Sequence, residues 1–193
     1  MKTISQALKL FLILTVITGV IYPLLITVLG QVIFPKQANG SLISINDQTI
    51  GSSLLGQKFA QEKYFWPRPS AIDYNPLPSG GSNLGPTNAM LKDLVREHKL
   101  ILEKSNSSSN AVPADLLFTS GSGLDPDISP EAARFQIERI VNARGLDNNN
   151  KIRLIDLVEK QIKKQDFGIL GEPRINVLEL NLALDSIFTG DNR

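Results

Sequence analysis

The stretch from Leu10 to Pro35 contains no charged residue and is mostly apolar. At about 1.5 Å of helical rise per residue, it is long enough to cross a hydrocarbon core of about 30 Å. A secretory signal peptide has a shorter apolar region, and the nearest candidate cleavage site here, around Ala38 and Gly40, lies beyond Pro35. The sequence therefore predicts an uncleaved transmembrane helix over residues 10–34.

Basic residues are distributed unevenly around this segment. Lys2 and Lys9 precede it, whereas Lys36 is the one basic residue close behind it. Because basic flanks tend to stay in the cytoplasm, we expect a cytoplasmic tail over residues 1–9 and an extracytoplasmic domain over residues 36–193.

Small and hydroxyl-bearing residues interrupt the apolar segment. Thr15, Gly19 and Tyr22 follow an i, i+4, i+7 spacing, which places them on one face of a regular helix. Such residues allow close helix contact, so this face is predicted to pack against another membrane subunit, the alternative being ordinary exposure to lipid. Pro23 is expected to bend the helix.

Composition excludes several classes of function. The chain has 193 residues, no cysteine and a net charge of +1. The length suits one domain with a small appendage, and the charge gives no reason to expect a nucleic-acid partner. Without cysteine there are no disulfides, no thiolate catalysis and no cysteine-bound metal.

Residues 64–91 are rich in proline and glycine and also carry aromatic and apolar side chains. Proline and glycine disfavour a regular helix or a central strand, while the apolar content is too high for a solvated linker. We therefore expect an ordered irregular loop that binds something. Trp66, Arg68 and Tyr74 are its candidate docking residues, because aromatic and arginine anchors dominate protein interfaces. Arg68 either pairs with a buried carboxylate or contacts a partner; Asp73, Asp125 and Asp127 are candidates for that pair, although turn capping is their preferred role.

The first half of the outer domain is predicted to contain a hairpin and a helix. Residues 41–45 and 48–55 alternate around the turn pair Asn46-Asp47. Apolar spacing predicts a helix from Pro86 to about Lys104, with the polar run 105–110 as a mobile surface loop.

The second half is predicted to contain one strand and three helices. Residues 112–119 read as a short buried strand, and a continuous helix should run from a Ser129 cap to Gly145. Residues 151–164 form the next helix, and Asn176 caps a last one over residues 177–188, where alternating leucines leave a strand possible. The predicted fold class is α+β: one transmembrane helix, then one domain with long proline- and glycine-rich loops.

The motifs YFxxRPSA, SGGSNLGPTN and SGSGLDPDISPEAA closely resemble the C subunit of the Kdp potassium-transporting P-type ATPase. The resemblance runs from the apolar segment to Asp185. It implies a non-catalytic accessory subunit in the bacterial inner membrane that supports assembly and raises the ATP affinity of a catalytic subunit. The implied partners are a potassium-selecting channel-like subunit, an ATP-hydrolysing P-type subunit and a small single-helix subunit. ATP, Mg²⁺ and K⁺ would bind at those partners.

The resemblance also links a glutamine-containing stretch to nucleotide affinity, which here maps onto Gln136 and Arg139. The sequence departs from the family at Glu138, where proline is expected, and this should make the helix more regular. An ordinary solvated helix face is the preferred alternative for both residues. If the domain lies outside the membrane, any effect on ATP must be allosteric.

Two other classes of function remain open on sequence alone. A membrane-tethered serine hydrolase would use Ser70, Ser79 or Ser120 with His98, the one histidine, but no GxSxG elbow accompanies them. A free-standing sensor domain is the third class. His98 is expected to be partly buried and hydrogen-bonded, no metal site is convincing, and the glycine loops match no established phosphate-binding pattern.

Overall fold

A computed structural model describes residues 2–106 and 111–188. The chain divides into two compact units, one ending at Ser52 and one beginning at Ser53. Each unit is described by itself. The expected mobile loop at 105–110 falls largely outside the described residues.

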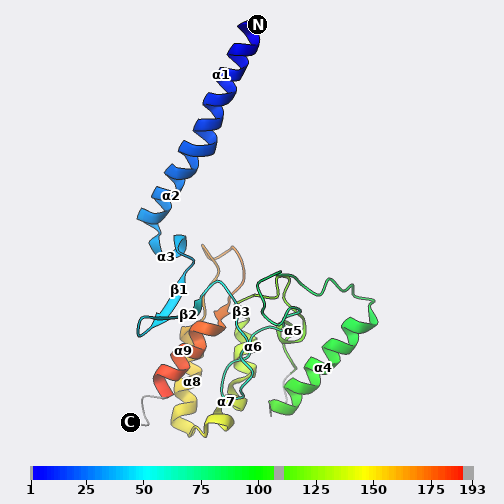
Figure 1. Cartoon of the computed structure of the whole chain (residues 1–193). Coiled ribbons are helices and arrows are strands. Elements are labelled where there is room, and N and C mark those ends of the chain that lie inside the picture. Colours follow the sequence, from blue (N-terminus) through cyan, green and yellow to red (C-terminus); the bar gives the residue numbers. More distant parts are fainter. Residues whose placement is uncertain (1, 107–110, 189–193) are drawn as a thin grey trace. The chain divides into compact units, whose positions relative to one another are not determined.

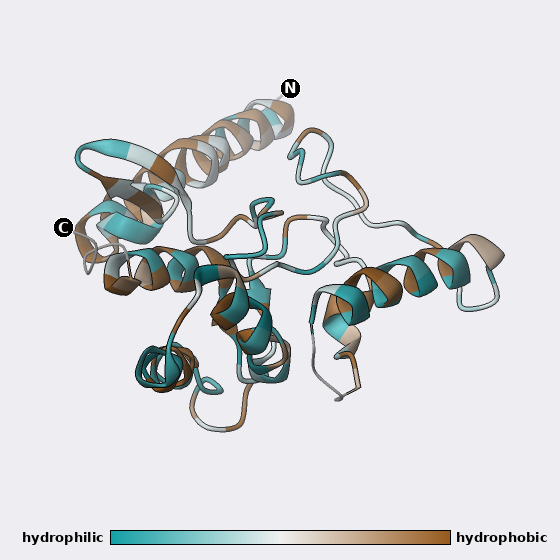
Figure 2. Cartoon of the chain, turned by 90° about the horizontal axis from the view of Figure 1, so that it is seen from below, coloured by the Kyte–Doolittle hydropathy of each residue, from teal (hydrophilic) through white to brown (hydrophobic). Residues whose placement is uncertain are grey.

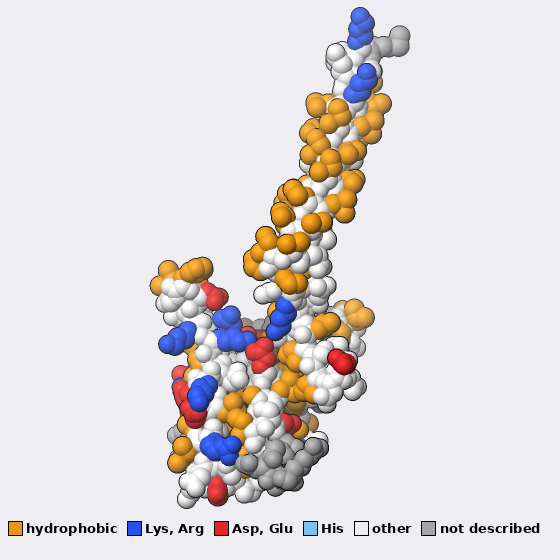
Figure 3. Space-filling view, turned by 90° about the vertical axis from the view of Figure 1, so that its left-hand side faces the viewer, with side chains coloured by type: hydrophobic (Ala, Val, Ile, Leu, Met, Phe, Trp, Pro, Cys, Tyr) orange, Lys and Arg blue, Asp and Glu red, His pale blue; other side chains and the backbone are white. Residues whose placement is uncertain are grey.

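The first unit begins with a long apolar helix. It comprises α1 (Lys2–Val16), a π-helical turn η1 (Ile17–Ile21) and α2 (Tyr22–Ile33). The span Lys2–Ile33 has a mean hydropathy of 2.5 over its best window, and by length and composition it can cross a membrane. Figure 2 shows apolar residues along most of this helix, and in Figure 3 hydrophobic side chains cover the face toward the viewer, with basic side chains near the N-terminal end. The predicted helix is confirmed, although it begins earlier than residue 10.

The π-helical turn lies immediately before Pro23. Proline has no N–H to donate to the preceding turn, and a π-turn is one way for a helix to accommodate that gap. The hydroxyls of Thr15 and Thr18 each donate to the carbonyl four residues earlier, at 2.8 Å. These threonines therefore satisfy their polar groups within the helix, as an apolar environment requires.

A short helix and a hairpin complete the first unit (Figure 1). After α3 (Pro35–Ala38), strand β1 (Leu42–Ile45) pairs antiparallel with β2 (Gln48–Ser52). Asn46 and Asp47 both have positive φ, 50° and 61°, as a tight hairpin turn with a right-handed twist requires. The predicted hairpin is confirmed, with its second strand ending at Ser52.

The second unit is mostly helical. Its elements are α4 (Ala89–Ser105), α5 (Ala114–Leu117), β3 (Asp127–Ile128), α6 (Pro130–Phe135), α7 (Ile137–Arg144), α8 (Asn148–Lys160), β4 (Ile175–Asn176) and α9 (Val177–Phe188). Among the described residues, strands are limited to the hairpin and the β3–β4 pair, so the α+β prediction is confirmed only as a mostly helical fold with two small sheets. The core lies where α6 to α9 meet; its fully buried side chains include Ile140, Leu154, Val158, Leu180 and Leu184.

Local capping chemistry sets most helix boundaries. Ser129 accepts from the Ala132 amide at 3.0 Å, and Asn176 accepts from the Glu179 amide at 3.0 Å. Gly145 ends α7 in the left-handed region, with φ of 62°. These predicted ends are confirmed, and the last segment is a helix rather than a strand.

Three predicted elements differ from the structure. Residues 112–119 hold the helical turn α5, not a strand, because Pro113 stands directly before it and only Leu116 within that turn is buried. Helix α4 starts after Asn88, whose side chain accepts from the Met90 amide, instead of at Pro86. Helix α8 is capped by Asp147 and ends at Lys160, so it begins and ends three or four residues earlier than the predicted helix over 151–164.

The helix expected from Ser129 to Gly145 is interrupted. Helix α6 ends at Phe135 and α7 begins at Ile137, with Gln136 at the junction. The absence of proline at position 138 therefore does not make this region one regular helix.

Candidate functional site

Five consecutive carbonyls in the irregular loop accept hydrogen bonds from side chains of distant helices. The donor–acceptor distances are 2.9 Å or more, apart from a shorter one between Arg139 and the Glu62 carbonyl. The pairs are Glu62 and Tyr64 with Arg139, Lys63 with Arg144, Phe65 with Asn181, and Trp66 with Gln136. We call residues 62–66 the clamped segment. Its buried backbone groups require partners, and helical side chains supply what a neighbouring strand would supply in a sheet.

Two carboxamides hold this segment in the same way. The Gln136 amide group accepts from the Trp66 N–H at 2.7 Å and donates to the Trp66 carbonyl at 3.1 Å. Asn181 accepts from the Phe65 N–H at 2.8 Å and donates to the Phe65 carbonyl at 3.0 Å. Each carboxamide thus pairs with one residue of backbone in two directions.

Gln136 and Arg139 are buried, with exposed fractions of 0% and 2%. The preferred expectation of a solvated helix face is therefore wrong for both. Gln136 lies three residues after Ala133 and four before Ile140, on the same inward face as these two buried residues. In the sequence, this spacing indicates an inward position for Gln136, whereas the polarity of its side chain favours solvent.

The Arg139 guanidinium stacks on the Trp66 ring, with 3.9 Å from its central carbon to the ring centroid. One terminal nitrogen donates to the Gln136 carboxamide oxygen at 2.6 Å, while Nε is buried without a hydrogen-bond partner. Burial lowers the pKa of Arg139 to about 10, and the charge of Glu62 opposes this. The side chain therefore remains a cation near neutral pH, held by carbonyl oxygens and an aromatic face.

Arg68 forms an ion pair with Asp125 at 2.8 Å. Pairing with a carboxylate was one of the two roles predicted for Arg68, and it is confirmed. The other oxygen of Asp125 accepts from the Asp127 N–H at 3.0 Å, which is the predicted turn-capping role. Arg68 still keeps 27% of its side chain exposed. Burial, followed by the charge of Asp125, raises the pKa of Asp127. Asp73 forms an exposed pair with Lys58 instead.

Tyr74 closes this part of the loop on itself. Its hydroxyl donates to the Arg68 carbonyl, and its N–H donates to the Ser70 hydroxyl at 2.9 Å. Burial raises the pKa of Tyr74, and the negative charges of Asp73 and Asp125 add to the increase. Trp66, Arg68 and Tyr74 are therefore brought together in one loop, and each is only partly buried.

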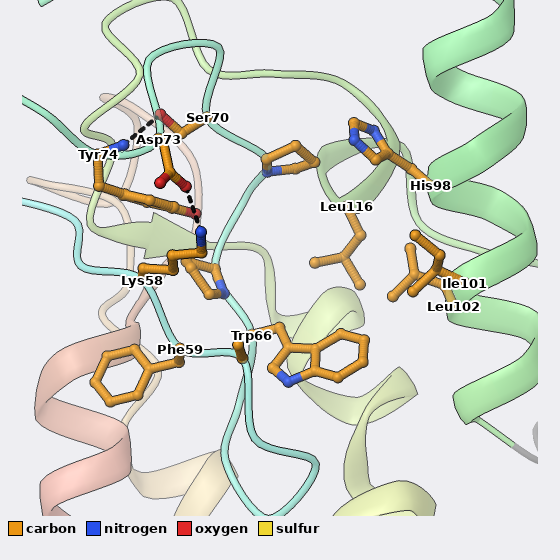
Figure 4. A pocket seen from close by; sticks show the side chains of 13 residues that line it. Lys58, Phe59, Trp66, Ser70, Asp73, Tyr74, His98, Ile101, Leu102 and Leu116 are labelled. Atoms are coloured by element: carbon orange, nitrogen blue, oxygen red, sulfur yellow. Dashed lines mark hydrogen bonds and ion pairs between the residues drawn. The ribbon is translucent and has the colours of Figure 1, made fainter.

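A cavity of about 390 Å³ opens beside this loop. Figure 4 shows Trp66 and Tyr74 on the loop side and His98 with Leu116 on the side of α4 and α5. The lining residues are mainly apolar and aromatic, which is the character of a binding groove.

The serine and histidine of the hydrolase hypothesis do not form a pair here. Ser70 and His98 line the same cavity, but the Ser70 hydroxyl donates to the Gly123 carbonyl at 2.7 Å. The His98 ring bonds to the Leu117 carbonyl at 2.9 Å, which confirms its predicted part-buried, hydrogen-bonded state. Ser120 is buried and Ser79 is exposed on the loop.

The two glycine-rich loops pack backbone against backbone. The Gly80 N–H donates to the Ser122 carbonyl at 2.9 Å, and a Cβ at Gly81 would stand 2.9 Å from the Gly121 carbonyl oxygen. This close approach requires glycine, because a side chain would collide with the facing backbone. The glycine-rich motif therefore has a structural explanation that does not involve binding a phosphate.

In the first unit, Thr15, Gly19 and Tyr22 all belong to the exposed surface of the long helix. Nothing lies within 4 Å of a Cβ built at Gly19. The π-turn falls between Thr15 and Tyr22, so their i, i+7 spacing does not have the phase of a regular helix. Over residues 2–106 and 111–188, no cluster of three or more histidine or acidic side chains could hold a metal ion.

In the described part of the chain, one helix is long and apolar enough to cross a membrane and a compact, mostly helical domain follows it, an arrangement that suggests a single-pass membrane protein. The family model described as KdpC, the c chain of the K⁺-transporting ATPase, matches residues 4–186. A potassium-transporting ATPase KdpC subunit from Rhodopseudomonas palustris is 52% identical, covering 96% of this chain and 98% of the relative. One from Leptospira interrogans is 47% identical, covering 97% and 96%. The chain belongs to the KdpC family, a non-catalytic subunit of the Kdp ATPase.

Proposed function

We propose that this chain supports assembly of an ATP-driven potassium importer and raises the ATP affinity of its catalytic subunit from a distance. Family membership supports a role in the Kdp complex. The burial of Gln136 supports the indirect mechanism, because a side chain with no exposed surface and four hydrogen bonds to protein groups has none left for a nucleotide.

The proposed partners are a potassium-selecting channel-like subunit, an ATP-hydrolysing P-type subunit and a small single-helix subunit. ATP, Mg²⁺ and K⁺ are bound by those partners. Lys2 and Lys9 favour a cytoplasmic N-terminus and a domain outside the inner membrane. With that orientation, the subunit acts by binding one conformation of the pump better than another.

Two surfaces are proposed to contact the partners. The first comprises Trp66, Arg68 and Tyr74, which are partly exposed. Their loop is held by the Gln136 bond to the Trp66 carbonyl and by the Arg68–Asp125 pair. The second comprises Thr15, Gly19 and Tyr22, which are all exposed on the long helix, on either side of and within the π-turn. Both sets carry side chains suited to contact, aromatic and arginine in the first and small or hydroxyl-bearing in the second.

The contribution of Gln136 to ATP affinity is tested in the intact complex with Gln136→Ala. This change removes both bonds to Trp66 and the acceptor for Arg139, so we expect the apparent ATP KM to rise with little change in K⁺ affinity. Asn181→Ala is the matched control, because it releases the neighbouring residue Phe65 in the same geometry. Unchanged kinetics in Gln136→Ala would remove this role, and tight ATP binding by the domain alone, seen by calorimetry, would make the mechanism direct.

The contact surfaces are tested by recovery of the partner subunits during purification. Arg68→Ala and Gly19→Leu should each lower recovery, the first by removing an interface anchor and the second by blocking close helix approach. Lys160→Ala is a control, since it removes an exposed ion pair with Asp156 within α8, and Lys160 does not line the cavity beside the loop. Normal recovery with Arg68→Ala would assign Arg68 to the internal pair with Asp125.

A further inference from the structure

The segment between α8 and β4 carries three apolar side chains on its outer surface. Phe167 is 92% exposed, Ile169 80% and Leu170 56%. We call residues 166–170 the apolar turn. Adjacent exposed apolar residues on a monomeric domain mark a contact with another protein or with a membrane.

The backbone holds the apolar turn in a defined shape. Asp166 and Leu170 exchange two hydrogen bonds, each of 2.9 Å, and Lys163 and Arg174 exchange two more at its base, at 2.8 and 3.0 Å. Phe167 has a positive φ of 55°, a conformation uncommon for an aromatic residue. The outward position of these side chains is therefore imposed by local structure, at some conformational cost.

The apolar turn stands at the end of the domain where the chain arrives from the anchor helix. The segment leads directly into β4, and within β4 the Asn176 side chain donates to the Ser53 carbonyl at 2.8 Å. Ser53 is the first residue of the domain, and residues 34–52 join it to the helix that ends at Ile33. The α7–α8 junction lies at the opposite end of the domain (Figure 1).

Basic side chains surround the base of the turn. Lys163, Lys164 and Arg174 flank it. Lys163 pairs with Glu179. Arg174 lies 3.4 Å from Asp127 and 3.9 Å from Asp166, the acidic residue of the turn itself. Long basic side chains beside an apolar tip are typical of segments at a membrane surface, where their stems lie in the apolar layer and their charges reach the headgroups.

From these observations we infer that the apolar turn inserts Phe167 and Ile169 into the headgroup boundary of the bilayer that holds the anchor helix. The domain then has a second, reversible attachment besides its covalent tether. Two attachments restrict how the domain can rotate above the membrane. This role goes beyond the proposed action on ATP affinity, and it requires only that the anchor be inserted.

The absence of native cysteine allows a clean spectroscopic test on the full chain in lipid vesicles. Ile169→Cys is labelled with an environment-sensitive fluorophore, and lipids with a spin label near the headgroup serve as quenchers. Ile152→Cys on α8 is the matched control, since Ile152 is the same residue type, is 65% exposed and lies in the N-terminal part of α8, close to the α7–α8 junction. Val20→Cys, within the anchor, reports insertion.

We expect a blue-shifted emission at position 169 and quenching by the shallow spin label at least about twofold stronger than at position 152. Adding Phe167→Asp to the Ile169→Cys chain should abolish the difference. Equal, weak quenching at both positions, with the Val20 label protected in the bilayer, would overturn the inference. Weak lipid quenching combined with a blue shift that appears only in the assembled complex would also overturn it, and would assign the turn to a protein partner.

Discussion

At the scale of single residues, the clamped segment depends on side chains that replace secondary structure. Gln136 and Asn181 each bond to both backbone groups of one loop residue, and Arg139 supports the same loop with an aromatic stack. Losing one such partner leaves buried backbone groups unsatisfied, at about 1–3 kcal/mol for each group. These residues therefore hold the docking loop in place, and a change in them reaches the surface through Trp66.

Tyr74 makes the stability of the domain vary with pH in the alkaline range. A tyrosine ordinarily has a pKa of about 10, and burial raises that of Tyr74, so the folded chain keeps this proton more tightly than the unfolded chain. The resulting stability is present below about pH 10 and is lost as pH rises through the higher folded pKa.

Tyr74→Phe removes that dependence. At neutral pH the variant should be less stable by about 1 kcal/mol, because the bond to the Arg68 carbonyl is lost. Between about pH 8 and about pH 11, the difference from the original chain should stay constant at first and then shrink once pH passes the unfolded-state pKa of about 10. Thermal unfolding followed by circular dichroism over that range measures it. Burial lowers the pKa of Arg139, but Arg139 is present in both proteins, so its effect cancels in the comparison. A stability difference that stays constant up to about pH 11 would contradict the raised pKa of Tyr74.

At the scale of elements, sequence rules succeeded where short-range chemistry decides the outcome. The Ser129 and Asn176 caps, the Asn46-Asp47 turn and the Gly145 terminus were all predictable, since each depends on a few neighbouring atoms. Helix α5 was missed because an apolar run of this length fits a strand or a helix equally well.

The candidate site was only partly predictable for the opposite reason. Trp66, Arg68 and Tyr74 were found by composition, but the loop that carries them is held by residues far away along the chain, as with Phe65 and Asn181, which are 116 positions apart. No local pattern carries that information. The inward spacing of Gln136 was the one usable signal.

The contact between the two glycine-rich loops gives a prediction at this scale. A Cβ at Gly123 would lie 2.5 Å from Ile72 and 2.8 Å from the Gly80 carbonyl oxygen, and φ is +70°. Gly123→Ala should therefore lower the free energy of unfolding by about 1–3 kcal/mol, measured by urea denaturation. Gly85→Ala, with nothing within 4 Å of its Cβ, should change it little. Equal effects would show that the loops do not depend on this close approach.

At the scale of the whole molecule, two units of different character share one chain. The first is an apolar helix with a hairpin, and the second is a mostly helical domain with its own core. The proposed orientation makes the second unit extracytoplasmic.

Protease added to intact spheroplasts tests this orientation. We expect digestion of residues after the anchor while cytoplasmic marker proteins stay whole, because the charges of Lys2 and Lys9 retain the N-terminus inside. Disrupted cells provide the control for cleavage at both sides. Full protection in intact spheroplasts would place the domain inside and permit direct contact with ATP.

The ladder of carbonyls over residues 62–66 has a consequence for how this protein can vary. A carbonyl oxygen is the same atom in every amino acid, so a substitution at Glu62 or Lys63 keeps the hydrogen-bond acceptor and loses only what the exposed side chain adds, such as the charge of Glu62 near Arg139. The donors have no such freedom, since Arg139, Arg144, Gln136 and Asn181 must each keep their length and shape. Substitutions of these helical side chains are therefore expected to disturb the loop more than substitutions of Glu62 or Lys63 within it.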